Sequence, residues 1–205
     1  MNMEIPKEAF LPIIKELQRK PLEINKYRYK SGTGKSQTFG IVNRRCLPPD
    51  YSRLCWLRPL LYKLLLEFAE KYVPISFNAI TVNQDYKADK HRDKHNLGNS
   101  FLVAFGDFTG GELVIHEGDL SGTHNIQYKP IITDFSKVFH SVNDFVGNRY
   151  SLVFYTLTSK RLGYLPPPSI REENDKLFFY RGEEKITNGL PHPLRKENKK
   201  ISSQN

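Results

Sequence analysis

Two histidines and one aspartate in this chain have the residue types and spacing of a metal site. His91 and Asp93 are two residues apart, so in an extended segment both side chains point to one face and can reach the same ion. His140, much further along the chain, can supply a third ligand from another strand. Two histidines and one carboxylate form the facial set that holds non-haem Fe(II) and leaves coordination positions open. The sequence therefore predicts an iron site at His91, Asp93 and His140.

An arginine follows the second histidine at the start of a strand pattern. Arg149 opens residues 149–155, and its planar fork can hold a carboxylate through two parallel hydrogen bonds. Because side chains alternate along a strand, Ser151 and Tyr155 should share the inner face with Arg149. An arginine on an inner face needs a partner. Together with the metal ligands, this carboxylate anchor predicts an oxygenase that uses Fe(II), O2 and the co-substrate 2-oxoglutarate.

Two other motifs that the sequence resembles are incomplete. Residues 91–93 also resemble the start of a protein-kinase catalytic loop, but the position of the expected asparagine holds Gly98. Residues 32–36 resemble the end of a P-loop, but the position of its first glycine holds Tyr29. A His-x-Asp pair alone is often an ordinary hydrogen-bonded loop pair. Only the downstream histidine and arginine give it the pattern of a metal site.

Length and composition favour one soluble domain. The chain has 205 residues, a mass of 23.8 kDa and 39% hydrophobic residues, enough for one core over residues 1–190. Residues 1–76 should hold helices and a basic loop, 77–158 the catalytic strands and 159–190 a C-terminal extension, before a disordered basic tail at 191–205. Two cysteines give no disulfide framework, and neither a signal peptide nor a membrane-spanning run is evident. We expect an intracellular monomer, cytoplasmic or nuclear.

The net charge of +9 is concentrated in two segments. Residues 21–58 hold eight basic residues against two acidic ones, and residues 195–200 hold four against one. The eight are Lys26, Arg28, Lys30, Lys35, Arg44, Arg45, Arg53 and Arg58. Such a segment suits a polyanion such as DNA, because phosphate contacts supply most nucleic-acid affinity. A merely solvated basic surface remains an equal alternative.

The remaining pattern predicts helices outside a strand-rich core. Apolar spacing predicts helices at residues 6–19 and from Pro59 to residue 73, whereas residues 20–40 should be a loop with a short strand, mobile around 31–36. A mobile loop at residues 32–40 could close on nucleic acid. Strands are expected at 77–82, 101–105, 112–115, 126–130, 137–140, 150–156 and 177–180, with a turn at 108–111. This order favours a mainly β fold with flanking helices (α+β), a double-stranded β-helix of the jelly-roll or cupin-like type.

Three segments resemble the TET/JBP family of nucleic-acid base dioxygenases, which oxidise the methyl group of 5-methylpyrimidines. Residues 77–96 resemble the iron-binding segment of the TET enzymes, and residues 149–155 resemble their 2-oxoglutarate strand. Residues 101–113, ending Gly-Gly-Glu-Leu, resemble the short JBP-type members. The resemblance covers about residues 77–158. It implies a short, single-domain member of this family.

The resemblance also implies a role for each matching residue. Iron would be bound by His91, Asp93 and His140, 2-oxoglutarate by Arg149 and Ser151, and the target base by Asn96, Tyr155 and His95. A base extruded from the stack needs an aromatic face and polar groups for its pairing edge. The expected activity is hydroxylation of the 5-methyl group of 5-methylcytosine or thymine in DNA, with ascorbate as a stimulant.

Two departures from the family pattern limit this expectation. Two cysteines cannot build the zinc-binding region of the TET enzymes, so the chain corresponds to a minimal catalytic core. Leu157 stands where the TET pattern has a base-contacting histidine, and an amide such as Asn96 both donates and accepts. The choice between 5-methylcytosine and thymine, and between DNA and RNA, therefore stays open.

Three other functions compete with this one. A protein hydroxylase of the prolyl-hydroxylase type shares the barrel and triad, but it typically anchors 2-oxoglutarate with lysine rather than arginine. An AlkB-like demethylase also combines arginine with a nucleobase. A basic nucleic-acid-binding module without catalysis is the non-enzymatic alternative, although the complete ligand set argues against it.

Overall fold

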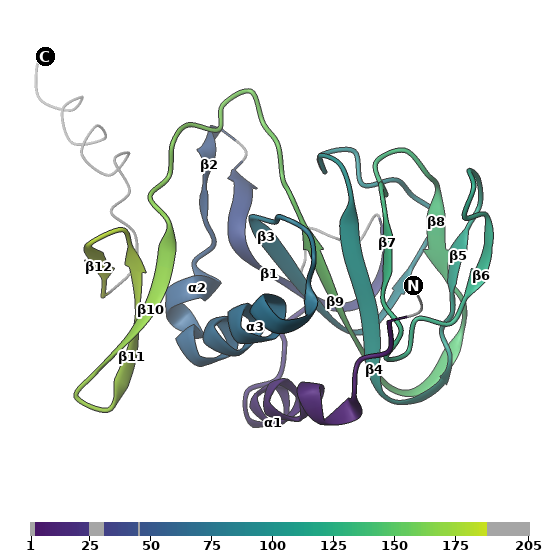
Figure 1. Cartoon of the computed structure of the whole chain (residues 1–205), viewed down its shortest axis with the longest axis horizontal. Helices are drawn as coiled ribbons and strands as arrows, with labels where there is room; N and C mark the ends of the chain where they lie inside the picture. The colour runs from purple at the N-terminus through teal and green to yellow at the C-terminus, as the bar shows by residue number, and fades with distance from the viewer. Residues whose placement is uncertain (1–2, 25–30, 45, 188–205) are drawn as a thin grey trace, which may run out of the picture.

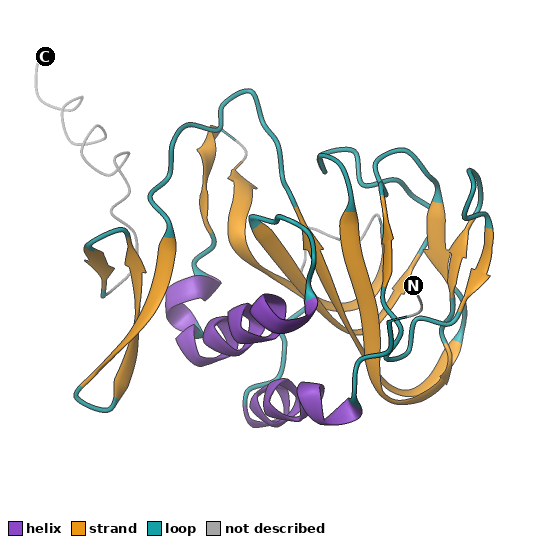
Figure 2. Ribbon diagram, viewed as in Figure 1, coloured by secondary structure: helices purple, strands orange, loops and turns teal. Residues whose placement is uncertain are grey.

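The computed structural model describes residues 3–24, 31–44 and 46–187 of the chain. Its helical elements lie mainly near the N-terminus and its strands form three antiparallel sheets (Figures 1 and 2). The helical elements are η1 (Lys7–Phe10), α1 (Leu11–Arg19), α2 (Leu54–Leu57) and α3 (Pro59–Tyr72). The strands are β1 (Gly32–Arg44), β2 (Leu47–Tyr51), β3 (Ala79–Ala88), β4 (Ser100–Gly110), β5 (Leu113–Ile115), β6 (Gly122–His124), β7 (Ile131–Thr133), β8 (His140–Val142), β9 (Phe145–Tyr155), β10 (Pro168–Glu173), β11 (Lys176–Arg181) and β12 (Glu184–Ile186).

A six-stranded sheet of order β2-β1-β3-β9-β4-β7 forms the main wall, and a smaller sheet of order β6-β5-β8 lies beside it (Figure 1). A third sheet, β10-β11-β12, is formed by the C-terminal segment. The described strands pair with their neighbours in antiparallel fashion. This arrangement confirms the predicted jelly-roll fold with flanking helices.

The helices cover one face of the large sheet and form the larger core with it. Proline is tolerated at the first turn of α3, where its missing N–H would have no helical partner. Leu61, Leu65 and Phe68 on the inner side of α3 are buried in this core. Phe10 stacks on Phe105 of β4, with 4.6 Å between ring centroids. Both helices predicted from apolar spacing are thus confirmed, and the first turn of the N-terminal one is a 3-10 helix.

The opposite face of the large sheet meets the small sheet. A second apolar cluster fills part of the space between them, with Leu102 of β4 and Leu113 of β5 among its members. The remaining space is a cavity that holds the residues with predicted chemistry. The barrel interior is therefore divided between apolar packing and a polar site.

Strand β9 separates the two environments because its side chains alternate. It pairs with β3 on one side and β4 on the other, so both of its faces are covered. Tyr150, Leu152 and Phe154 belong to the core beneath the helices, whereas Arg149, Ser151, Val153 and Tyr155 line the cavity. The predicted direction of these side chains is confirmed.

The predicted loop at residues 32–40 is wrong, because these residues form most of β1. Residues 32–40 pair with β3 along most of their length. A Cβ at Gly32 would lie 2.1 Å from the Lys87 carbonyl oxygen, and one at Gly34 would lie 2.3 Å from that of Asp85. The glycines therefore permit a close approach of two strands instead of a turn. The suggested closing loop at this position is excluded by the same pairing.

Several strand boundaries also differ from the sequence prediction. The turn expected at residues 108–111 is wrong, because Phe108, Thr109 and Gly110 continue β4 and pair with β9. Residues 126–130 form only one isolated bridge instead of a strand, and Tyr128 has a φ of +60°. The strand expected at 137–140 begins only at His140. The expected strand at 177–180 is part of β11, whereas β10 and β12 were not predicted.

Three further predictions concern the cysteines, membrane-spanning helices and the C-terminal tail. Cys46 and Cys55 are both free, as expected. None of the helices in the described ranges is long and apolar enough to cross a membrane. The basic tail predicted at residues 191–205 lies outside the described residues.

Candidate active site

Backbone pairing brings the two predicted ligand segments together. His91 follows β3 and His140 begins β8, and these two residues form an isolated antiparallel bridge. The amide of His91 donates to the carbonyl of His140 at 3.0 Å, and the amide of His140 donates to the carbonyl of His91 at 2.9 Å. The amide of Asp93 donates to the carbonyl of Phe135 at 3.0 Å. Residues far apart in sequence thus present their side chains to one point.

The three side chains form a cluster with the geometry of a possible metal site. One ligand atom each of His91, Asp93 and His140 lies within 4.8 Å of the others. The Nε2 atom of His91 is 3.4 Å from Oδ1 of Asp93. The Nδ1 atoms of His91 and His140 lie 2.6 Å and 3.3 Å from the carbonyl oxygens of Asp89 and Val138. Such backbone bonds fix the tautomer that leaves Nε2 available as a ligand.

Burial keeps the second histidine in the form that can bind metal. His140 is only 6% exposed, and its burial lowers the pKa of the imidazole, an effect that the Asp93 charge opposes. A neutral imidazole is the ligating form. The donor set therefore fits a divalent ion such as Fe(II).

The cluster lines a cavity of about 100 Å³ inside the barrel. Leu102, Leu113, Phe135, Val142 and Val153 give it apolar walls. Its polar lining comes from Ser31, Thr81, Asn83, Tyr86, His91, Asp93, Asn96, His140, Arg149, Ser151 and Tyr155. The apolar walls limit water around the polar groups.

Arg149 is held in this cavity as a buried cation. Its side chain is 2% exposed, and its guanidinium carbon lies 5.5 Å from the ring centroids of both Phe108 and Phe145. Burial lowers the pKa of Arg149 to about 10, which still leaves it charged at neutral pH. Its Nε atom has no hydrogen-bond partner among the described residues. A buried charged donor without an acceptor is costly unless a ligand supplies one.

A bulge in β3 places the backbone of Arg149. Asp85 has a φ of +49°, and its Oδ1 accepts a hydrogen bond from the Arg149 amide at 2.9 Å. The register of β1 against β3 shifts at this position, between Thr33 and Lys35. The side chain of Asp85 thus replaces a backbone acceptor at the point where the ladder between β3 and β9 ends.

Sequence reasoning missed a polar residue beside the predicted co-substrate site. Asn83 pairs with Ser151 across β3 and β9, and its Nδ2 donates to the Ser151 hydroxyl at 3.1 Å. The Oδ1 atom of Asn83 is buried and has no partner within the described part of the chain. The alternation of Thr81 and Asn83 with apolar neighbours in β3 was the signal that could have identified it.

The three predicted base-contacting residues lie in different environments. Asn96 lines the cavity, but its Nδ2 lies 3.3 Å from Oδ2 of Asp93, so the amide also orients a predicted metal ligand. Tyr155 lines the cavity as well, and its hydroxyl lies 3.3 Å from that of Thr81. His95 is exposed and is not among the residues that line the cavity.

Gly111 gives the Arg149 side chain the space it occupies. A Cβ at Gly111 would lie 2.8 Å from Nε and 2.9 Å from Cδ of Arg149, and its φ is +71°. We expect Gly111→Ala to displace the guanidinium and to raise the 2-oxoglutarate concentration needed for half-maximal binding at least tenfold. The matched control is Gly98→Ala, because Gly98 has a φ of +67° but no atom within 4 Å of its Cβ position. Equal 2-oxoglutarate titrations by calorimetry for both variants would contradict this role.

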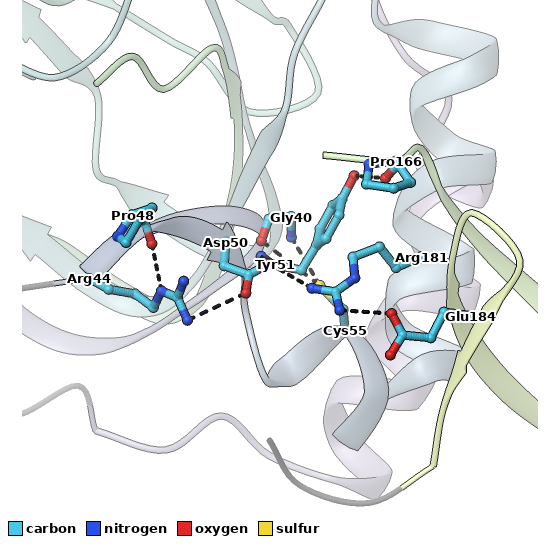
Figure 3. Close-up of polar contacts among 9 residues, drawn as sticks. All are labelled: Gly40, Arg44, Pro48, Asp50, Tyr51, Cys55, Pro166, Arg181 and Glu184. Atoms are coloured by element: carbon cyan, nitrogen blue, oxygen red, sulfur yellow. Dashed lines mark hydrogen bonds and ion pairs between the residues drawn. The ribbon is translucent and has the colours of Figure 1, made fainter. Parts of the chain in front are cut away.

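The basic segment contributes less exposed charge than predicted. Arg58 is 3% exposed and donates to the side chain of Gln37 and the carbonyl of Lys20, so it cannot contact a phosphate. Arg44 and Arg181 both approach Asp50 at 3.4 Å (Figure 3). Lys26, Arg28, Lys30 and Arg45 lie outside the described residues.

These paired arginines line a larger cleft of about 590 Å³ between β1, β2, α2 and the C-terminal sheet. Arg181 also bonds Glu184 at 2.8 Å, and the Tyr51 hydroxyl donates to the carbonyl of Pro166 at 2.9 Å (Figure 3). The contacts of Asp50 and Tyr51 thus join the C-terminal segment to β2. The cleft contains none of the triad residues, so its greater size does not make it the reaction site.

Comparisons with known proteins locate this architecture among solved structures. No family model and no curated protein matches the chain. The structure of NgTET1 in complex with 5mC DNA has a TM-score of 0.53 and 15% identity, covering 77% of this chain and 70% of that one. The chain has the fold of NgTET1.

Two further structures are similar at lower scores. An oxidoreductase of the 2OG-Fe(II) oxygenase family from Burkholderia pseudomallei has 18% identity and a TM-score of 0.45, covering 69% of this chain and 74% of that one. A Pseudomonas putida prolyl-4-hydroxylase has 12% identity and a TM-score of 0.49, covering 77% and 91%.

Proposed function

We propose that this chain is an Fe(II)- and 2-oxoglutarate-dependent oxygenase that hydroxylates the 5-methyl group of a pyrimidine in DNA. The observation that supports it most is one cavity containing both the His91, Asp93 and His140 cluster and the buried Arg149, whose Nε lacks a described partner. The fold shared with NgTET1, which was solved with 5mC DNA, supports the choice of substrate. The proposed oxygenase domain comprises residues 1–190.

Each side chain has a defined share in this function. His91, Asp93 and His140 would hold Fe(II), which together with O2 and 2-oxoglutarate supplies the oxidation that hydroxylates a C–H bond. Arg149 would hold the far carboxylate of 2-oxoglutarate, with the Ser151 hydroxyl beside it. The apolar walls exclude water, which strengthens these charged contacts.

The target base would lie at the mouth of the cavity. The cavity of about 100 Å³ is smaller than the roughly 300–1,000 Å³ of common ligand sites, so a base would extend beyond it. Tyr155 and Asn96 both line the cavity, and they offer a ring face and an amide oxygen. An extruded base requires both kinds of contact.

Product analysis tests the proposal directly. The protein is incubated with Fe(II), 2-oxoglutarate and ascorbate and with DNA containing or lacking 5-methylcytosine, and the digested nucleosides are measured by mass spectrometry. We expect a new 5-hydroxymethylpyrimidine; its identity distinguishes 5-methylcytosine from thymine. RNA and proline-containing peptides are parallel substrates. Succinate released only with peptide would contradict the nucleobase assignment.

The ring of Tyr155 is expected to contribute more than its hydroxyl. Tyr155→Ala should weaken binding of a single-stranded methylated oligonucleotide by about 1–3 kcal/mol, the range for one base on an aromatic ring. Tyr155→Phe keeps the ring and loses the hydroxyl that contacts Thr81, so its affinity should stay within about twofold of the parent. Fluorescence anisotropy at fixed salt measures both. Similar losses for the two variants would contradict stacking.

Phosphate contacts would come from basic residues that stay accessible. Lys35 is partly exposed and Arg53 is exposed, in contrast to Arg58. Neutralising either one should reduce the slope of log affinity against log salt by about 0.9 for each lost phosphate contact. Lys63→Ala on the helical face is the control, since Lys63 lies on α3 beside Glu67. An unchanged slope in Lys35→Ala and Arg53→Ala would exclude this surface as the docking face.

A further inference from the structure

Arg92, between the predicted ligands His91 and Asp93, connects the ligand segment to another part of the fold. Its Nε and one terminal nitrogen lie 3.0 Å and 2.7 Å from Oε1 of Glu117. Glu117 follows β5 in the small sheet, and Arg92 is not among the residues that line the cavity. Arg92 therefore binds a neighbouring segment while the residues on either side of it line the site.

The same carboxylate oxygen also binds the segment that carries the third ligand. Oε1 of Glu117 accepts a hydrogen bond from the amide of Phe139 at 2.6 Å. The guanidinium carbon of Arg92 lies 4.2 Å from the centroid of the Phe139 ring. Phe139 immediately precedes His140. One oxygen and one ring thus join the two ligand-bearing segments from outside the cavity.

The negative charge of Glu117 is consistent with its contacts to Arg92 and to the Phe139 amide. Hydrogen bonds from Arg92 and from the Phe139 amide lower the pKa of Glu117, so the carboxylate is ionised at neutral pH. Side-chain exposure is 35% for Arg92 and 37% for Glu117, and a pair this accessible to water contributes little to global stability. Its effect should therefore be local and geometric.

The local geometry needs such support. Between His91 and His140 the backbone forms an isolated bridge of two hydrogen bonds instead of a continuous ladder, and the Asp93 amide adds one bond to the carbonyl of Phe135. The segment that carries His91 could move away from β8 by opening these few bonds, which would move its imidazole away from the shared point. Ligand sets bind metal more tightly when outer contacts hold their geometry, and loss of such contacts typically costs 10–100-fold in affinity.

We propose that Arg92, Glu117 and the Phe139 amide and ring form a clasp that holds both ligand segments at ligating distance before metal binds. These are positioning residues, because none of them is part of the ligand set. An arginine is required, since lysine lacks the planar fork and the flat surface that stacks on an aromatic ring. The consequence for metal affinity rests on the proposed function, whereas the closure of the two segments does not.

Two readouts on the metal-free and metal-loaded protein test the clasp. Glu117→Ala should raise the amide hydrogen-exchange rate of Phe139 and His140 at least tenfold in metal-free protein. It should also weaken Co(II) or Fe(II) binding 10–100-fold in chelator competition. Glu117→Gln keeps an oxygen acceptor and should restore most of the exchange protection. Arg92→Met should change the exchange rates and the metal affinity in the same direction as Glu117→Ala.

The matched control is a second exposed arginine–glutamate pair. Arg171 binds Glu183 at 3.0 Å and 2.9 Å in the C-terminal sheet, away from the site. Arg171→Met should leave both readouts unchanged. Exchange rates in Glu117→Ala within twofold of the parent would overturn the clasp. Faster exchange with unchanged metal affinity in Glu117→Ala would show that the clasp does not affect metal binding. A parent protein that binds no metal would overturn the proposed function, and the exchange rates would still test whether the clasp exists.

Discussion

Asp93→Ala is expected to reduce Fe(II) binding and succinate formation to background. Asp93 supplies the only carboxylate among the three clustered side chains, and its ligand atom lies within 4.8 Å of those of both histidines. Two neutral imidazoles alone neither balance the charge of the ion nor complete a facial set. Isothermal titration with Co(II) or Fe(II) under anaerobic conditions measures binding, and succinate is measured separately by mass spectrometry.

A nearby histidine provides the control for this result. His95 is two residues beyond Asp93 but is exposed and does not line the cavity. His95→Ala should bind metal as the parent does, whereas His91→Ala should behave as Asp93→Ala. Melting temperatures should show that all three variants fold. Full turnover by a folded Asp93→Ala protein would refute the ligand assignment.

Arg149→Lys is expected to raise the 2-oxoglutarate concentration needed for half-maximal activity on the order of 10–100-fold. Hydrogen bonds to charged groups contribute about 1.5–3 kcal/mol, and each 1.4 kcal/mol corresponds to a factor of ten. Lysine keeps the charge but loses the two parallel donors that match a carboxylate. It also lacks the guanidinium carbon that lies 5.5 Å from the ring centroids of both Phe108 and Phe145.

A second buried arginine separates loss of the anchor from loss of stability. Arg58 is 3% exposed, as Arg149 is 2% exposed, and each has a buried Nε without a partner among the described residues. Arg58 lies among Gln37 and Lys20 and lines no part of the triad cavity. Arg58→Lys should lower the melting temperature but leave the 2-oxoglutarate requirement unchanged. An equal increase in the 2-oxoglutarate requirement of both variants would show that Arg149 does not bind the co-substrate.

The parts of the fold that sequence could predict depend on local periodicity. The apolar spacing of residues 6–19 and of α3 identifies helices because one helix face must be buried. Alternation in β9 separates Arg149 and Ser151 from Leu152 and Phe154 because strand side chains point to opposite faces. Residue types also predicted that His91, Asp93 and His140 form one cluster, and their ligand atoms do lie within 4.8 Å of one another.

Glycine-rich and charged segments were predicted less well because their meaning depends on distant neighbours. Gly32 and Gly34 have the composition of a loop, and only the strand β3 beside them shows that they permit close pairing. Arg58 and Arg53 are equivalent basic residues in the sequence, but one is buried and the other exposed. No local pattern distinguishes these cases, because burial is decided by contacts between separate segments.

By itself, the sequence determined which side chains of β9 share a face, and it predicted which residues would ligate iron and which would hold a carboxylate. These properties follow from side-chain type and a short repeat along one strand. Only the tertiary structure decided that His140 meets His91, that Asn83 joins Ser151 and that Glu117 connects Arg92 to Phe139. Each of these contacts joins residues distant in sequence, so its geometry depends on how the strands pair and where the chain bulges.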